Sequence, residues 1–188
     1  YKSTANAISA DAVDTFTYIR SNMRRRDETL LLEKLAYKDF LTGGFNRTAY
    51  ERDVQNYLDT QKSFRLILLD LNELKHIYDT YGHSQGDEAI RLVFNAMKTG
   101  FVQGKNYRIG GDEFAVLIED VDATRFKDCL DNFQSILNET TKDFLYPILV
   151  AVGSDVYHYG DWDNYSRFYH HVDQKMYLHK KKIKNTKK

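Results

Sequence analysis

One nearly continuous apolar run extends from Phe64 to Leu71, with the sequence Phe-Arg-Leu-Ile-Leu-Leu-Asp-Leu. Its length is typical of a strand that is covered on both faces. Within 145–158, apolar side chains recur at every second position from Tyr146 to Val152, which predicts another long strand. Two short strands are expected at 106–109 and 113–119, because the glycine pair between them is typical of a tight hairpin.

Helical patterns fill the intervals between these strands. Over 11–37 a partial apolar stripe is interrupted by the charged residues 24–28, so this segment is interpreted either as an exposed helix or as a signalling helix that pairs with a partner chain. Asn46 is expected to cap the next helix. The order of elements indicates an α+β domain in which helices pack on an antiparallel-rich sheet. The further helices are predicted over 46–60, 73–81, 84–98, 122–138 and 163–184.

Composition narrows the functional classes. The 188 residues suffice for about one domain, and a hydrophobic content of 42% can bury a core. Lys and Arg number 27, as do Asp and Glu, so anions must be bound by local patches and no nucleic-acid partner is indicated. The single cysteine, Cys129, cannot form an internal disulfide, and a small buried apolar role is favoured for it over a catalytic thiol.

Targeting signals are not visible in this sequence. No apolar run approaches the ~18 residues of a membrane span, and no signal peptide is recognised. The chain begins with Tyr1 rather than Met, which predicts a fragment whose sensor or membrane portion lies upstream. We therefore expect a cytoplasmic domain, either of a membrane-bound protein or of another larger sensor protein.

Three acidic residues stand at the expected ends of strands. Asp70 lies near the end of the apolar run, where a buried carboxylate is costly unless it is paired or bound to metal. Asp112 and Glu113 lie at the tip of the glycine hairpin, which can bring them beside that end. Their hard oxygen atoms suit Mg²⁺ that carries phosphates. Taken singly, Asp70 could instead form a salt bridge with Arg108, and Asp112 could be a turn residue.

Four motifs occur in a fixed order and together resemble the GGDEF family of nucleotidyl cyclases over about 39–184. The signature that names the family is matched by Arg108-Ile109-Gly110-Gly111-Asp112-Glu113-Phe114. The other three matches are Asp39-x-Leu41-Thr42-Gly43-x-x-Asn46-Arg47, then Asp70-x-Asn72-x-x-Lys75 with Asp79-x-x-Gly82-His83-x-x-Gly86-Asp87, and finally Asp173-x-x-Met176-Tyr177-x-x-Lys180.

The resemblance implies a fold and a reaction. The fold is ferredoxin-like and similar to a polymerase palm, with a five-stranded, mostly antiparallel sheet flanked by helices. Residues 1–37 form a signalling or linker helix, and 38–188 form the GGDEF domain. The reaction condenses two GTP into cyclic di-GMP with release of pyrophosphate and depends on Mg²⁺ or Mn²⁺. Because one domain binds one GTP, a homodimer is expected, with a sensor domain upstream.

Roles of individual residues also follow from the resemblance. Asp70 and Asp112 would ligate the metal ion, with the Leu71 carbonyl as a further ligand. Glu113 would assist catalysis or hold a second ion, and Lys75 would join the catalytic residues. In the substrate site, Lys75 and Lys180 would hold the triphosphate, and Lys184 stands where the family usually has Arg. Asp87 would contact the guanine edge. The same pocket would also include Tyr78, Gly110 and Gly111.

The chain departs from the family pattern at Tyr78, where an Asn usually contacts guanine. A tyrosine cannot present the paired donor and acceptor of an amide, so it would either stack on the base or block the pocket. Two alternatives therefore stay open: a degenerate domain that binds GTP or a protein partner without turnover, and a cyclase with relaxed base specificity. Asp87 also has a purely structural interpretation, because Ser84-x-x-Asp87 fits a helix capping box.

A second departure concerns regulation. The family's product-inhibition motif, Arg-x-x-Asp, is replaced by Phe101-Val102-Gln103-Gly104. Feedback inhibition through that site is predicted to be absent. The lysines from Lys180 onward also have a simpler interpretation, as a solvated helix end that complements the helix dipole.

Overall fold

The computed structural model describes residues 2–119 and 122–186. The chain divides into two compact units, the first ending at Lys38 and the second beginning at Asp39. The first unit is a single helix, α1 (Lys2–Tyr37), which includes the helix predicted from the sequence. Within the two described ranges, no helix is long and apolar enough to cross a membrane.

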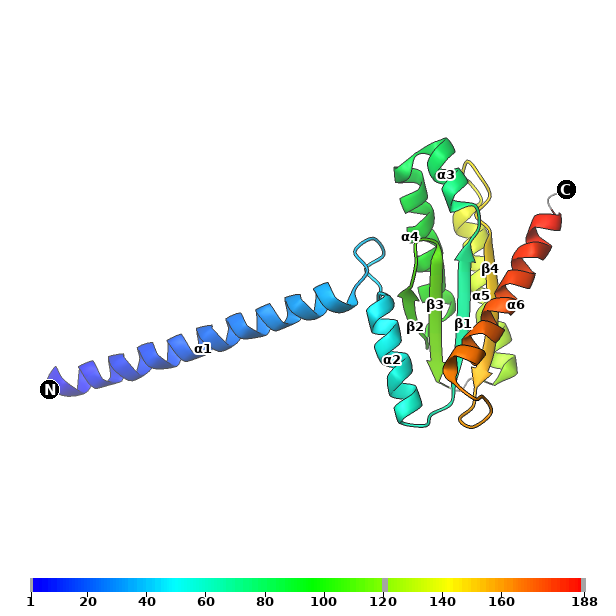
Figure 1. Ribbon diagram of the computed structural model, residues 1–188. Coiled ribbons are helices and arrows are strands. Elements are labelled where there is room, and N and C mark those ends of the chain that lie inside the picture. The colour runs from blue at the N-terminus through cyan, green and yellow to red at the C-terminus, as the bar shows by residue number, and fades with distance from the viewer. Residues whose placement is uncertain (1, 120–121, 187–188) are drawn as a thin grey trace. The chain divides into compact units, whose positions relative to one another are not determined.

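The second unit is built on one antiparallel sheet (Figure 1). All eight residues of its central strand β1 are buried, which confirms the prediction that this strand is covered on both faces. The expectation of five strands is wrong, because the described residues form a four-stranded sheet in the order β2-β3-β1-β4. The strands are β1 (Phe64–Leu71), β2 (Lys105–Arg108), β3 (Glu113–Glu119) and β4 (Val150–Tyr157).

The edge of the sheet at β2 explains why a fifth strand is missing there. Phe45 forms only an isolated parallel bridge with Tyr107 of β2. On one side of Phe45, the chain turns through Gly43, which has a φ of 69°. On the other side, Asn46 accepts a hydrogen bond from the backbone N–H of Ala49 and caps a helix, as predicted. The extended segment between turn and cap is therefore too short to form a ladder.

Strand β4 is shorter than the expected strand over 145–158. It begins at Val150, after Pro147, and a proline has no N–H group to donate to a sheet ladder. Before this proline, Tyr146 contacts helix α4 (His83–Gly100) and not a neighbouring strand, since its hydroxyl donates to the Gln85 carbonyl at 2.9 Å. Alternation of apolar residues over 146–149 thus reflects burial outside the sheet.

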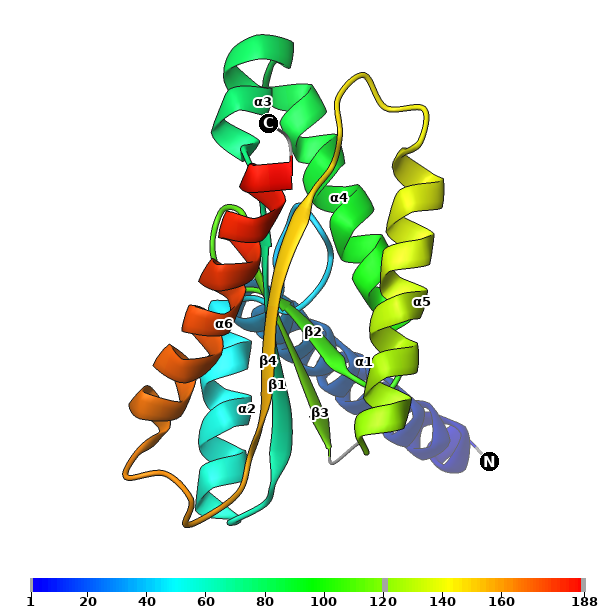
Figure 2. The same ribbon diagram turned by 90° about the vertical axis from the view of Figure 1, so that its right-hand side faces the viewer.

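Helices cover both faces of the sheet (Figure 2). On one face lie α4 (His83–Gly100) and α5 (Ala123–Thr141), which pack on the main apolar core. The other face carries α2 (Arg47–Asp59) and α6 (Tyr165–Thr186). The short helix α3 (Leu74–Tyr81) follows β1 directly and lies at one end of the sheet.

Helix α6 approaches β4 closely because Gly153 has no side chain. A Cβ atom at this position would lie 2.4 Å from the Val172 carbonyl oxygen and 2.4 Å from the Met176 nitrogen. The close packing holds the middle of α6 against β4. Lys180, one turn beyond Met176, is thereby placed beside Asp70 of β1.

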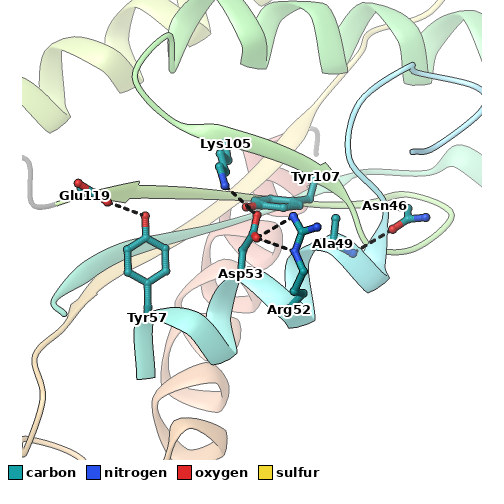
Figure 3. A network of polar contacts seen from close by, with 8 residues as sticks. All are labelled: Asn46, Ala49, Arg52, Asp53, Tyr57, Lys105, Tyr107 and Glu119. Carbon is teal, nitrogen blue, oxygen red and sulfur yellow. Dashed lines mark hydrogen bonds and ion pairs between the residues drawn. The ribbon is translucent and has the colours of Figure 1, made fainter. Parts of the chain in front are cut away.

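A polar network joins α2 to β2 (Figure 3). Its centre is the buried Asp53, which accepts hydrogen bonds from the Tyr107 hydroxyl at 2.7 Å and from Lys105 Nζ at 3.1 Å. Arg52 also donates to it, at 2.9 and 3.0 Å. Burial by itself would raise the pKa of Asp53, but these hydrogen bonds hold that pKa below its ordinary value. This acid is thus fully occupied by structural contacts.

Candidate active site

The end of β1 brings two predicted site residues together. Asp70 lies directly opposite Glu113 in the antiparallel register of β1 and β3. Opposed residues on neighbouring strands project from the same face of a sheet. The backbone N–H of Leu71 donates to the Asp112 carbonyl at 2.8 Å, which fixes the hairpin tip against β1. The three acids therefore occupy one end of the sheet.

Lys180 of α6 completes this group. Its Nζ atom lies 2.7 Å from Asp70 Oδ1 and 2.8 Å from Asp70 Oδ2. The Asp70 side chain is only 10% exposed, so the lysine compensates a carboxylate that burial would otherwise destabilise. Lys180 reaches Asp70 from the face of the sheet that α6 covers. Asp70 and Glu113 therefore project toward α6.

Arg108 is not the partner of Asp70, so that alternative interpretation is wrong. The guanidinium of Arg108 donates to the Gly111 carbonyl at 2.9 and 3.2 Å and pairs with Asp39 at 3.3 Å. Asp39 also accepts from the backbone and the hydroxyl of Thr42. Arg108 thus ties the glycine hairpin to the loop that precedes α2.

Negative charge accumulates at Glu113. Partial burial raises the pKa of Glu113, and the charges of Asp112 and Asp70 raise it further. Arg47 opposes this effect and Asp173 adds to it. No role was assigned to Arg47 or Asp173 from the sequence. Both lie inside the family motifs, and this location could have indicated that they belong to the site.

Gly110 leaves space for the Glu113 carboxylate. A Cβ atom at Gly110 would lie 2.7 Å from Glu113 Oε2, whereas a Cβ at Gly111 would meet nothing within 4 Å. The two glycines of the hairpin therefore differ in function. The first permits the position of an acidic side chain, and the second supplies a carbonyl to Arg108.

The donor set of this sheet end fits a magnesium ion bound together with phosphates. Among the residues that the structure describes, no three His, Cys, Asp or Glu side chains form a ready-made cage for a metal ion. Magnesium, however, is usually bound by one or two carboxylates together with water and substrate phosphates. Burial is the main cause of the raised pKa of Glu113, and the neighbouring charges of Asp112 and Asp70 add to it. A divalent cation bound here would reduce the repulsion between these carboxylates.

The second predicted region, around Asp87, lies where α3 meets α4. The Tyr78 hydroxyl donates to Asp87 Oδ1 at 3.1 Å. The capping-box interpretation of Asp87 is wrong, because α4 begins at His83 with Gly82 as its N-cap and without a side-chain capping bond. Ser84 therefore lies within the first turn, and Asp87 is oriented by a tyrosine instead.

The other predicted lysines remain apart from the acids. Lys75 on α3 and Lys184 near the end of α6 are both exposed. In the described part of the chain, neither forms an ion pair with Asp70, Asp112 or Glu113. Next to the acids, the side chain of Asn72 is buried and its amide oxygen and nitrogen lack hydrogen-bond partners. Buried amides without partners are uncommon in folded proteins.

Comparison with known proteins identifies the family. The family model described as "Diguanylate cyclase, GGDEF domain" matches residues 36–186. Diguanylate cyclase DgcN of Escherichia coli (strain K12) is 36% identical over 103 residues, which are 53% of this chain and 25% of that protein. Probable diguanylate cyclase DgcI of the same strain is 30% identical over 148 residues, which are 78% of this chain and 31% of that protein. The chain thus spans about a quarter to a third of these relatives' length.

The fold is also found in solved structures. The coiled coil and GGDEF domain of DgcB from Caulobacter crescentus, determined in complex with c-di-GMP, superposes with a TM-score of 0.73 at 23% identity. The alignment covers 93% of this chain and 94% of that one. At this identity the likeness establishes the α+β fold, while the sequence match over 36–186 establishes descent. The chain belongs to the GGDEF diguanylate cyclase family.

Proposed function

We propose that this domain is a diguanylate cyclase, which condenses two molecules of GTP into cyclic di-GMP and releases pyrophosphate. The observation that carries this proposal is the acidic group at the end of β1, where Asp70 faces Glu113 beside the hairpin tip. Such a group of hard oxygen atoms is what transfer of a phosphoryl or nucleotidyl group requires for its metal ion.

In this proposal Asp70 and Asp112 hold Mg²⁺ or Mn²⁺, with the Leu71 carbonyl as a further ligand. When bound, the ion lowers the pKa of the attacking 3′ hydroxyl and neutralises charge on the reacting phosphate. Glu113 carries a raised pKa, which suits a group that accepts and releases a proton near the reacting hydroxyl.

The lysines are assigned to the triphosphate. Lys180 already lies at the acidic group, where its ammonium can exchange a carboxylate partner for a phosphate oxygen. Lys75 and Lys184 are exposed and free to approach the phosphates from α3 and α6. Fixed positive groups around developing negative charge account for most of the catalysis in phosphoryl transfer. Gly110 and Gly111 let the hairpin backbone approach the nucleotide.

The reaction requires two copies of the domain. One domain binds one GTP, so two domains must face each other across a two-fold axis for the 3′ hydroxyl of one nucleotide to reach the α-phosphate of the other. We assign 38–188 to the cyclase domain and 1–37 to the helix that controls this encounter. The exposed apolar side chains of α1, such as Phe16 and Leu30, support pairing with a partner chain.

A single assay tests the assignment. The chain is incubated with Mg²⁺ and either GTP or ATP, and the products are separated by chromatography. Cyclic di-GMP that forms from GTP and disappears with Asp112→Ala supports the proposal. A correctly folded dimer that binds GTP but yields no cyclic product would contradict it and favour a binding domain without turnover.

A second candidate is favoured by one observation. The Tyr78 hydroxyl already donates to Asp87, the carboxylate assigned to the guanine edge. A domain in which this contact persists would bind nucleotide weakly and signal through a protein partner. Comparable product formation from ATP would point instead to relaxed base specificity.

A further inference from the structure

Tyr78 fills the space between α3 and the start of α4. A Cβ atom at Gly86 would lie 2.3 Å from Cε1 and 2.4 Å from Cδ1 of the Tyr78 ring. The ring therefore lies against the Gly86 backbone, in space that any other residue at position 86 would occupy. The Tyr78 ring also contacts the His83 ring, with 4.8 Å between the ring centroids and an interplanar angle of 45°.

The hydroxyl of Tyr78 reaches the carboxylate beyond this glycine. It donates to Asp87 Oδ1 at 3.1 Å. Burial raises the pKa of Tyr78, and the hydrogen bond to Asp87 raises it further. The phenol therefore keeps its proton at neutral pH and remains a donor. The partner of the Asp87 carboxylate is thus a planar aromatic ring that carries a hydrogen-bond donor at its edge.

A guanine base presents the same two features. It is planar and aromatic, and its N2 amino group and protonated N1 are donors on one edge. We infer that Tyr78 is a built-in occupant of the base subsite, which covers Gly86 and donates to Asp87 until a purine nucleotide displaces it. This inference rests on the base subsite at Asp87 that the proposed function assigns.

Displacement of the ring has a measurable effect on affinity. The apparent dissociation constant of a ligand equals its intrinsic value divided by the fraction of the protein that is in the binding-competent state. A hydrogen bond to a charged group, together with the ring packing on Gly86, is sufficient for about a tenfold effect. The factor is the same for any nucleotide whose base must displace the ring. ATP is expected to bind more weakly than GTP with or without the ring, because the edge of adenine offers an acceptor at N1 where Asp87 requires a donor.

Binding of non-hydrolysable GTP and ATP analogues, measured by isothermal titration calorimetry with the whole chain, tests the inference. Tyr78→Ala removes the ring and is expected to tighten GTP-analogue binding about tenfold. Tyr78→Phe keeps the ring but loses the donor, so a smaller gain is expected. Tyr81→Ala is the matched control, because Tyr81 lies on the same helix and packs on Tyr146 instead. Its affinity is expected to equal that of the unmodified chain.

Two outcomes separate failure of this inference from failure of the proposed function. Weaker binding in Tyr78→Ala, with unchanged thermal unfolding, would show that the ring stacks on the base, and it would overturn the occupant while leaving the subsite in place. The double variant Tyr78→Ala with Asp87→Ala tests the subsite itself. If the double variant loses the GTP-analogue binding seen in Tyr78→Ala, the assignment of Asp87 is supported. An affinity equal to that of Tyr78→Ala would overturn both the subsite and its occupant.

Discussion

Two aspartates on the same face of the sheet are equally buried but have opposite surroundings. Asp53 and Asp70 both retain only 7% of their surface. Asp53 accepts hydrogen bonds from Tyr107, Lys105 and Arg52, and its pKa is held low. Asp70 has one cationic partner, Lys180, and shares its sheet end with further acids.

This contrast teaches how a structural acid differs from a candidate functional one. Around Asp53, donors outnumber acids, so the ionised form is stabilised and nothing more is needed. Around Asp70, acids outnumber cations, and the charges of Asp112 and Asp70 add to the effect of burial in raising the pKa of Glu113. A carboxyl pKa that is perturbed by burial and by specific neighbouring charges is more common at functional sites than elsewhere. Burial alone would not have distinguished the two aspartates.

The largest expected effect separates the two acids by activity. Asp70→Asn is expected to lower the rate of cyclic di-GMP formation at least about a hundredfold, because it removes a charge that holds the metal ion at the reacting phosphate. Asp53→Asn is expected to leave the rate per folded molecule unchanged. Initial rates, normalised by the folded fraction from circular dichroism, provide the measurement. Equal losses in both variants would break the contrast.

The next effect separates them by stability. Asp53→Ala leaves the buried Tyr107 hydroxyl without its acceptor, and we expect the free energy of unfolding to fall by about 1–3 kcal/mol. Urea denaturation followed by circular dichroism measures this change. Asp59→Ala is the matched control, because Asp59 is an exposed residue of the same helix whose partner is the exposed Gln55. A loss as large in the control would mean that the network around Asp53 contributes nothing specific.

A smaller effect sharpens the contrast within the hairpin. Gly110→Ala places a Cβ atom against Glu113 Oε2 and must move that carboxylate, whereas Gly111→Ala meets open space. We expect cyclic di-GMP formation to fall about tenfold in the first variant, since misplacement of a reacting group by a fraction of an ångström is costly. The second variant is expected to lose less, because its Cβ atom contacts no protein atom. Steady-state kinetics compares them, and the inverse ranking would refute the role of Gly110.

The smallest expected effect is the pH dependence of stability, which has opposite signs at the two sites. The pKa of Asp53 is lowered in the folded state, so its ionised form contributes stability that is lost as pH falls through and below the ordinary value of 3.8. The pKa of Glu113 is raised, so its ionised form costs stability at neutral pH, and that cost disappears as pH falls through the raised pKa.

Urea titrations at several pH values check these signs. The stability difference between the unmodified chain and Asp53→Ala should shrink toward low pH. Glu113→Gln should raise the free energy of unfolding at neutral pH by at most about 0.5 kcal/mol, since Glu113 is only partly buried and solvent screens its charge. A Gln variant less stable than the unmodified chain at pH 7 would show that Glu113 is compensated after all.

Much of this protein was determined by local sequence. The apolar run Phe64–Leu71 and the strand Glu113–Glu119 were predicted with the bounds that the structure has. Asn46 was recognised as an N-cap because capping depends on residues only three positions apart. The family was recognised from four motifs, because each motif is a short segment whose residue types and spacing can be identified without knowledge of the fold.

The choice of partners was decided only by tertiary structure. Lys180, 110 positions away, pairs with Asp70, while Arg108, which was considered only as an alternative partner, binds Asp39. Similarly, the missing fifth strand and the contact between Tyr78 and Asp87 depend on how separate elements meet. Propensity and periodicity describe the backbone of one segment at a time. Which charges and rings come into contact is set by packing across the sheet, where side chains from distant segments compete for the same buried space.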